Sequence, residues 1–388
     1  MRCISLVLFA TLVATAAAAA EGPRARDLGI PFEGSPGALN AITDVAGVTV
    51  GHVTLIEDLA DGRKVRTGVT TILPRGNASK TSPVFGGWFP LNGNGEMTGT
   101  SWIDESGYVE GPIMMTNTHS VGVVRDAVIA WRVRAGGPDR SGYWWSLPVV
   151  AETDDSYLND MNGFHVRPEH AAQALEAAAT GAVAEGNVGG GTGMVCHEFK
   201  CGIGTASRRV TVGGAEYTLG VLVQANYGIR DTLRIAGVPV GQQLREHRVY
   251  TNPALARDSG SIIVVVATDA PLLPHQLKRI ASRPALGLGR MGSFAGNGSG
   301  DMFLAFSTAN AQASGGAAPA TVTFLGNDAL DPLFEATVQA TEESIVNALV
   351  AARDMQGNAG HYVNALPHAE LVKLLKQYGR LVKTAVPR

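Results

Sequence analysis

The chain has 388 residues, 45% of them hydrophobic and 17% charged, and this balance is typical of a globular protein and excludes disorder along its whole length. The formal net charge of -3 leaves no basic excess that would favour binding to nucleic acid. Beyond the amino-terminal segment, no run approaches the roughly 20 uninterrupted apolar residues of a membrane helix. The sequence therefore predicts neither a nucleic-acid nor a membrane partner.

The amino-terminal segment has the pattern of a secretory signal. Arg2 supplies a positive charge, residues 4–14 form an apolar run, and the small residues 16–20 follow it. We expect residues 1–20 to be a signal peptide that is cleaved before Glu21. This predicts a periplasmic or secreted protein.

The elements that follow alternate between strands and helices. Short β-rich runs, most of them bounded by Gly, Asn or Pro, lie at 48–50, 70–73, 113–116, 217–223, 262–266, 302–306 and 321–324. Helical periodicity appears at 169–179, 274–281, 332–352 and 370–381, with Asp331 as the expected N-cap of the third helix and Pro332 at its first position. No repeat or charged linker divides the chain, which favours one domain. The pattern fits helices over both outer faces of paired sheets, but it also fits a doubly wound single sheet.

Two cysteines, Cys196 and Cys201, remain after the signal and flank His197 and Glu198. The four side chains could in principle bind zinc, although structural zinc sites normally draw ligands from two segments. In an oxidising compartment a small-loop disulfide is favoured over zinc. Two unpaired buried thiols remain a third interpretation.

Four stretches are richer in Gly, Asn and Asp than folding alone requires. They are Leu91-Asn-Gly-Asn-Gly-Glu-Met-Thr-Gly99, residues 152–160, the glycine-rich residues 185–193, and residues 258–271 with their continuation at 296–301. The glycine-rich run lacks the Gly-Lys-Ser/Thr ending of a phosphate loop. No Gly-x-Ser-x-Gly elbow occurs, and no histidine stands in a recognisable position beside a serine. These absences argue against an α/β-hydrolase and leave a conventional Ser-His-Asp triad unsupported.

Gly260 and Ser261 stand at the entrance to the buried strand at 262–266. If the Ser261 hydroxyl attacks the Gly260 carbonyl, an N-to-O acyl shift gives an ester, and its hydrolysis frees Ser261 as a new amino terminus. That residue would carry both a nucleophile and an α-amino group with a reference pKa of about 7.7–8.0, suited to act as a base. A Gly-Ser pair before a strand is more often an ordinary turn, so this pattern alone does not decide.

The chain resembles the self-processing aminopeptidases of the DmpA type and the β-peptidyl aminopeptidases. The resemblance is carried by residues 40–45, 91–99, 185–193, 260–264, 267–274, 297–301 and 341–343, in one order along nearly the whole mature chain. It implies an αββα sandwich of the Ntn-hydrolase type and self-cleavage between Gly260 and Ser261. The products would be an α subunit (21–260) and a β subunit (261–388) of one catalytic domain. It further implies an assembly of four processed pairs, with no cofactor and no metal.

The same resemblance implies roles for individual residues. Ser261 would be the nucleophile of both self-cleavage and catalysis, Asn226 the side-chain donor to the oxyanion, and Ser299 and Asp301 the groups that orient the nucleophile and its amine. Asp301 departs from the glutamate that some members carry there. Glu152 would bind the ammonium of the substrate, and Tyr157 would be a second donor to the oxyanion. The structural alternatives are a surface charge or a structural hydrogen-bond acceptor for Glu152 and Asp301, and a core aromatic for Tyr157.

The sequence therefore predicts a serine aminopeptidase that removes amino-terminal residues from small peptides, amides or esters, including β- or D-amino-acid derivatives. Two alternatives remain open at this point. One is an acyltransferase of the ornithine acetyltransferase type, and the other is a non-catalytic periplasmic binding protein.

Overall fold

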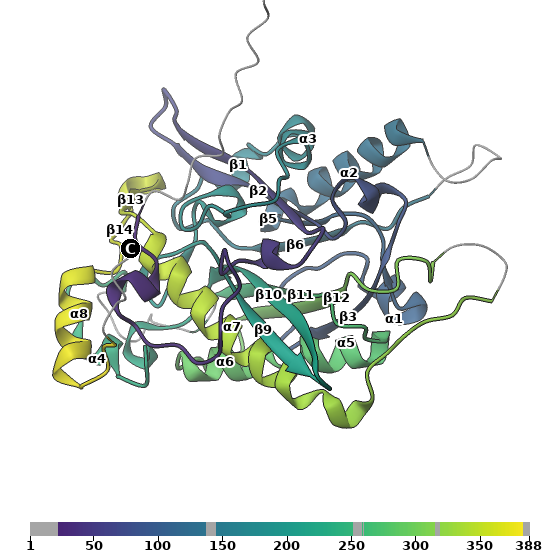
Figure 1. Cartoon of the computed structure of the whole chain (residues 1–388). Helices are drawn as coiled ribbons and strands as arrows, with labels where there is room; N and C mark the ends of the chain where they lie inside the picture. The colour runs from purple at the N-terminus through teal and green to yellow at the C-terminus, as the bar shows by residue number, and fades with distance from the viewer. Residues whose placement is uncertain (1–21, 137–144, 251–257, 259, 315–318, 383–388) are drawn as a thin grey trace, which may run out of the picture.

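Two β-sheets packed face to face form the centre of the computed structural model, which describes residues 22–136, 145–250, 258, 260–314 and 319–382 (Figure 1). The four-stranded sheet has the order β1 (Thr49–Asp58), β2 (Lys64–Leu73), β5 (Ile113–Asn117) and β6 (Val149–Thr153). The six-stranded sheet has the order β4 (Tyr108–Val109), β3 (Val84–Pro90), β12 (Gly300–Ser307), β11 (Ser261–Thr268), β10 (Ala215–Asn226) and β9 (Ile203–Val212). Two short hairpins pair β7 (Val195–Cys196) with β8 (Phe199–Lys200), and β13 (Met355–Gln356) with β14 (Tyr362–Val363).

Helices cover the outer face of each sheet. On the four-stranded sheet lie α2 (Val121–Ala135) and α3 (Pro168–Glu176), and on the six-stranded sheet lie α5 (Pro274–Ala281) and α7 (Asp331–Ala351), with α6 (Pro284–Arg290) packed against α7 (Figure 1). Shorter or peripheral helices are α1 (Thr100–Ser106), α4 (Val240–Gln243) and α8 (His368–Gln377). The layers are thus helix, sheet, sheet, helix, as the αββα prediction required, and the single-sheet alternative is wrong.

Strand β11 shows why its sequence is apolar without interruption. Its side chains alternate between two buried layers: Ile263 and Val265 face the core between the sheets, whereas Ile262 and Val264 face the core beneath the helices. A strand that is covered on both faces gains from β-branched residues at every position. It also pairs in parallel with β12 and antiparallel with β10, so its first residue lies in the middle of the sheet.

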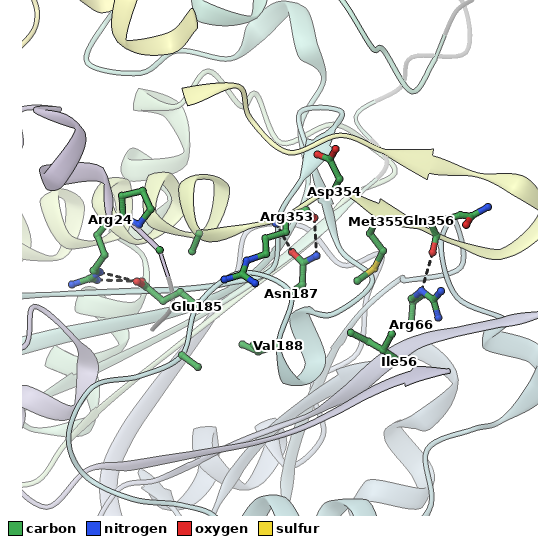
Figure 2. Close-up of a pocket in the computed structure, with 14 residues that line it drawn as sticks. Arg24, Ile56, Arg66, Glu185, Asn187, Val188, Arg353, Asp354, Met355 and Gln356 are labelled. Carbon is green, nitrogen blue, oxygen red and sulfur yellow. Dashed lines mark hydrogen bonds and ion pairs between the residues drawn. The ribbon is translucent and has the colours of Figure 1, made fainter. Parts of the chain in front are cut away.

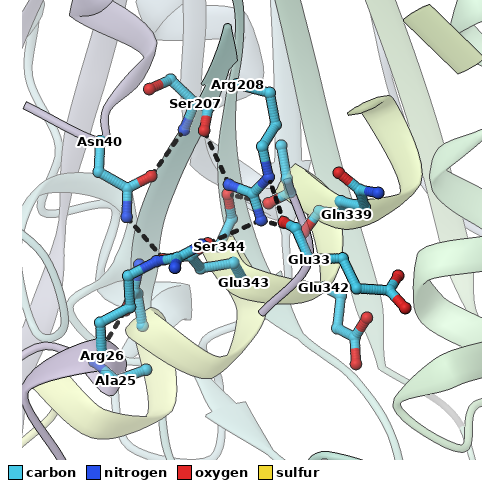
Figure 3. Close-up of polar contacts among 12 residues, drawn as sticks. Ala25, Arg26, Glu33, Asn40, Ser207, Arg208, Gln339, Glu342, Glu343 and Ser344 are labelled. Atoms are coloured by element: carbon cyan, nitrogen blue, oxygen red, sulfur yellow. Dashed lines mark hydrogen bonds and ion pairs between the residues drawn. The ribbon is translucent and has the colours of Figure 1, made fainter. Parts of the chain in front are cut away.

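A buried ionic network ties the amino-terminal segment and β9 to helix α7 (Figure 3). The carboxylate of Glu343 is fully buried and accepts hydrogen bonds from Arg26 at 2.7 and 2.8 Å and from Asn40 at 2.6 Å. The Arg208 guanidinium, 1% exposed, lies 2.8 Å from the same carboxylate. Two stretches of the family resemblance, 40–45 and 341–343, therefore meet in this structural network and not at the predicted catalytic residues.

Several predicted elements are confirmed and three details are wrong. The helix at 274–281 and most predicted strands occur as expected. Residues 321–324 form no strand, because the side chain of Asn310 binds both backbone groups of Thr323. Asp331 is the first helical residue and not an N-cap, since a 3₁₀ turn at Asn327–Ala329 leads directly into the helix. The last helix ends at Gln377, before Gly379 with its φ of 63°.

Within the described residues no helix is long and apolar enough to cross a membrane. The predicted signal peptide, residues 1–20, lies outside the described residues, and the division into two subunits stays a prediction.

Candidate active site

Ser261 is the first residue of β11, and it lies between the two neighbouring strands β10 and β12. It lies opposite Asn226 of β10 in the antiparallel pairing and opposite Gly300 of β12 in the parallel pairing. Its exposed fraction is 5%. The sheet therefore holds this serine in a fixed position, with Ser299 and Asp301 on either side of Gly300 along the chain.

Ser299 and Asp301 form a buried pair on either side of Gly300, the sheet partner of Ser261. The Ser299 hydroxyl donates a hydrogen bond of 2.7 Å to Oδ1 of Asp301, while Oδ2 is buried and has no hydrogen-bond partner among the described residues. Burial raises the pKa of Asp301 to about 6; the hydrogen bond from Ser299 opposes this rise and the nearby charge of Asp258 adds to it. A buried carboxylate oriented in this way, next to the sheet partner of Ser261, is suited to position the polar groups of that serine.

Asn226 is held by both ends of its side-chain amide. Oδ1 accepts a hydrogen bond of 2.8 Å from the backbone N–H of Val195, and Nδ2 donates one of 2.9 Å to the carbonyl of Asp154. An amide fixed in this way, one strand away from Ser261, is a preorganised group of the kind that stabilises an oxyanion.

A cavity of about 420 Å³ opens beside Asn226 and Gly260. Tyr157 lines it, with its ring stacked on the imidazole of His361 at 4.1 Å between centroids. Burial, together with the charge of Glu198, raises the pKa of Tyr157, which therefore remains a neutral hydroxyl donor. The structure places Tyr157 in the same cavity as Asn226, and its predicted bond to an oxyanion stays a prediction.

Glu152 lies close to the same segment, since a Cβ at Gly95 would be 3.2 Å from both its carboxylate and the Cα of Gly300. One of its carboxylate oxygens accepts the backbone N–H of Glu96 at 2.9 Å, and the other accepts the hydroxyl of Thr118. It is 3% exposed, and burial raises its pKa. A carboxylate enclosed by neutral donors, with no cation bound to it among the described residues, is suited to receive a substrate ammonium.

The loop after β3 is hydrogen-bonded to the segment that carries Ser299 and Asp301. Asn92 and Asn94 donate side-chain hydrogen bonds of 3.0 and 2.7 Å to the carbonyls of Gly296 and Gly298. A Cβ at Gly300 would lie 2.4 Å from the Asn94 carbonyl oxygen, so only glycine permits this close approach. The stretches at 91–99, 152–160, 258–261 and 296–301 therefore converge on one site.

Sequence reasoning missed residues that support the predicted ones. The carboxylate of Asp258 accepts backbone N–H groups from Gly228 and Gly296, both at 3.1 Å, and so fixes the chain just before Gly260. Val195 and Thr118 hold Asn226 and Glu152, as described above. Asp258 stood inside a stretch that was singled out, whereas no sequence signal marks Val195 or Thr118, because their contribution depends on position in the fold.

Cys196 and Cys201 form a disulfide, which settles the alternatives left open for them. Both sulfurs are bonded to each other and are not available as zinc ligands. Elsewhere in the described part of the chain, no group of three or more His, Cys, Asp or Glu side chains could hold a metal ion.

The glycine-rich run at 185–193 packs between strands and does not line the cavity beside Ser261. A Cβ at Gly190 would lie 2.0 Å from the side-chain oxygen of Gln224. The start of the run instead borders a second cavity of about 560 Å³, where Glu185 pairs with Arg24 at 2.7 Å and Asn187 contacts Arg353 (Figure 2). None of the predicted catalytic residues lines that cavity, so the run has a structural role.

Comparison with known proteins agrees with this geometry. Residues 40–363 match the model of peptidase family S58. The chain is 57% identical over 389 residues to the β-peptidyl aminopeptidase BapA of Sphingosinicella microcystinivorans, covering 96% of this chain and 97% of that protein. These relatives are named as aminopeptidases, and neither an acyltransferase nor a binding protein is supported by them.

Two solved structures share the fold. The L-aminopeptidase D-Ala-esterase/amidase of Ochrobactrum anthropi, described as a variant of the Ntn-hydrolase fold, has a TM-score of 0.86 and 48% identity, covering 93% of this chain and 100% of its own. A β-aminopeptidase of Burkholderia sp. has a TM-score of 0.83 and 50% identity, covering 92% and 99%. The chain therefore belongs to peptidase family S58 and is an aminopeptidase with the Ntn-hydrolase fold.

Proposed function

We propose that this protein cuts its own chain between Gly260 and Ser261 and then uses Ser261 to release amino-terminal residues from small peptides, amides or esters. The observation that carries the proposal is the position of Ser261. It begins a central strand directly after Gly260, with Asn226 and Gly300 as its two sheet partners. Cleavage there would convert a buried position in the chain into an amino terminus that bears its own nucleophile.

In the proposed cycle, Ser261 attacks the carbonyl of the substrate and its hydroxyl proton passes to its own α-amino group. Asp301, oriented by the hydroxyl of Ser299, holds that amino group. Asn226 and Tyr157 donate to the oxyanion, and Glu152 binds the free ammonium of the substrate. The departing amine takes up the proton, and water then hydrolyses the ester that links the acyl group to Ser261.

The similarity to the β-peptidyl aminopeptidase BapA supports substrates whose first residue is a β-amino acid. The similarity to an L-aminopeptidase and D-Ala-esterase supports α-residues as well. A panel of p-nitroanilides of α-L, D and β-amino acids, compared by kcat/KM, would rank these classes. We further propose export to the periplasm or the medium, on the basis of the signal pattern, and assembly of four processed pairs.

The decisive experiment compares wild type with Ser261→Ala and, as a matched control, Ser282→Ala, whose hydroxyl lies at a helix end, where it donates to the carbonyl of Arg279 and accepts from the side chain of Arg283. Intact-mass measurement should find two fragments in wild type and control, one of them beginning Ser261-Ile262. Ser261→Ala should remain one chain without p-nitroanilide hydrolysis. A Ser261→Ala protein that is still cut and still active would show that the nucleophile lies elsewhere.

A further inference from the structure

The carbonyl of Gly260 already has a hydrogen-bond donor in the uncut chain. Its oxygen accepts the backbone N–H of Gly300 at 3.2 Å. This is the oxygen on which negative charge develops when Ser261 attacks the Gly260 carbonyl carbon. A backbone N–H at that position is the same kind of group that forms oxyanion holes in acyl transfer.

The side chain of Asn226 is engaged elsewhere in this state. Among the described residues its amide bonds only to Val195 and Asp154, and it makes no hydrogen bond to Gly260. These two contacts place the amide towards the cavity that Tyr157 and Gly260 line. The group predicted to stabilise the oxyanion of the substrate is thus not the group that holds the oxygen of the self-cleavage bond.

Close packing of the backbone fixes this arrangement. A Cβ at Gly260 would lie 2.0 Å from the carbonyl oxygen of Asn226, and one at Gly300 would lie 2.4 Å from that of Asn94. Such distances leave no space for any side chain at either position. The backbone N–H of Gly300 can therefore bond to the Gly260 carbonyl because both positions are glycines, which allow the neighbouring backbone to come this close.

We infer that the two reactions at Ser261 use different oxyanion donors: the backbone N–H of Gly300 serves self-cleavage, and the side chain of Asn226 serves substrate turnover. This inference rests on the proposed function. In self-cleavage the Ser261 oxygen bonds to the Gly260 carbonyl carbon, the bond from that carbon to the Ser261 nitrogen breaks, and the hydroxyl proton ends on that nitrogen. Water then hydrolyses the ester and leaves a carboxyl group on Gly260.

The first test separates the two reactions in one variant. Asn226→Ala should still cut itself, at a rate close to that of wild type, because its side chain makes no hydrogen bond to the Gly260 carbonyl. Its kcat on a p-nitroanilide, per cut chain, should fall about 10²- to 10³-fold, the usual effect of losing one oxyanion donor. A folded Asn226→Ala chain that stays uncut, while wild type is cut, would overturn the inference.

The second test removes only the N–H of Gly300. Replacing this glycine with glycolic acid during cell-free synthesis turns the amide between residues 299 and 300 into an ester. Self-cleavage, followed by gel and intact mass from the end of synthesis, should slow by about 10²- to 10³-fold. The matched control is the same replacement at Gly298, whose N–H donates no hydrogen bond to the described residues, and it should cut at the normal rate.

If Asn226→Ala does not fold, the comparison between the Gly300 ester and the Gly298 ester still tests the role of the Gly300 N–H. Equal rates for the two esters would overturn the role of Gly300. These outcomes differ from failure of the proposed function, in which the wild-type chain itself would remain whole under the same conditions or would be cut without Ser261.

Discussion

The hydroxyl of Ser299 donates to the carboxylate of Asp301 at 2.7 Å, and the other oxygen of that carboxylate is buried without a partner among the described residues. The pair lies one residue to each side of Gly300, the sheet partner of Ser261. Ser299 therefore orients the carboxylate of Asp301, and the second carboxylate oxygen remains available to accept a hydrogen bond. Its protonation state decides what that oxygen can do.

Activity should fall at acid pH with the titration of Asp301. The pKa of Asp301 is raised to about 6, so the carboxylate is ionised above that pH and protonated below it. If only the ionised form can hold the amine of Ser261, kcat/KM should lose a further tenfold per pH unit below 6, added to the fall that protonation of the catalytic amine causes below its own pKa of about 7.7–8.0. A pH profile on a p-nitroanilide, with the exposed Asp328→Asn as control, checks this.

Stability should respond to the same group with the opposite sign. Because the folded pKa of Asp301 lies above its unfolded value, the folded state binds more protons between about pH 4 and 6. The ionised carboxylate thus costs stability above pH 6, and that cost disappears as the pH falls. Asp301→Asn should unfold at higher denaturant concentration than wild type at pH 8 while losing activity; lower stability there would contradict the assignment.

Glu152→Gln should weaken substrate binding and leave self-cleavage intact. The uncut chain has no ammonium at this site, whereas the substrate brings one, and a hydrogen bond to a charged group contributes about 1.5–3 kcal/mol. KM should therefore rise roughly 10- to 150-fold, with two fragments still present by intact mass. Asp126→Asn, an exposed carboxylate change on α2, is the control. An unchanged KM would show that another group binds the amine.

The stretches that meet at this site could be singled out from the sequence, because the glycines that allow close backbone approaches at Gly260 and Gly300 leave a local pattern. The roles of Ser261, Ser299 and Asp301 came only from the family resemblance and stay predictions, since a Gly-Ser pair before a strand is more often an ordinary turn. The disulfide was only one of three interpretations, because ligand types do not reveal the separation of two sulfurs.

Other features depended on contacts that no local pattern encodes. The interpretation of residues 321–324 as a strand failed because Asn310, distant along the chain, takes the backbone groups of Thr323. The support of Asn226 by Val195 likewise depends on a hairpin packing against another strand.

Removing the disulfide should lower kcat as well as stability. Cys196 directly follows Val195, whose N–H holds the side chain of Asn226. Chain-entropy arguments assign about 2 kcal/mol to a bridge that closes so small a loop. The double variant Cys196→Ser/Cys201→Ser should lose about that much unfolding free energy and should also show a lower kcat. A loss of stability with an unchanged kcat would show that the disulfide does not act on turnover through the side chain of Asn226.

Glu343 should hold the two fragments together after self-cleavage. Its carboxylate belongs to the predicted β subunit, and its partners Arg26, Asn40 and Arg208 belong to the predicted α subunit. Although burial alone would raise its pKa, the bonds from Arg26 and the charge of Arg208 outweigh burial and lower it. The folded carboxylate is therefore ionised at neutral pH, and its stabilising effect is lost only as the pH falls through this lowered pKa.

Glu343→Gln would leave the Arg208 guanidinium buried beside a neutral amide. Removing one partner of a buried ion pair typically costs about 3–5 kcal/mol, because the remaining charge has lost its compensation. The cut variant should unfold at lower urea concentration than wild type and release separate fragments in size-exclusion chromatography at dilutions where wild type stays associated. Glu342→Gln, the neighbouring acid that pairs with the half-exposed Arg290 at 3.0 Å, is the matched control and should change little. Equal losses in the two variants would mean that the network does not join the fragments.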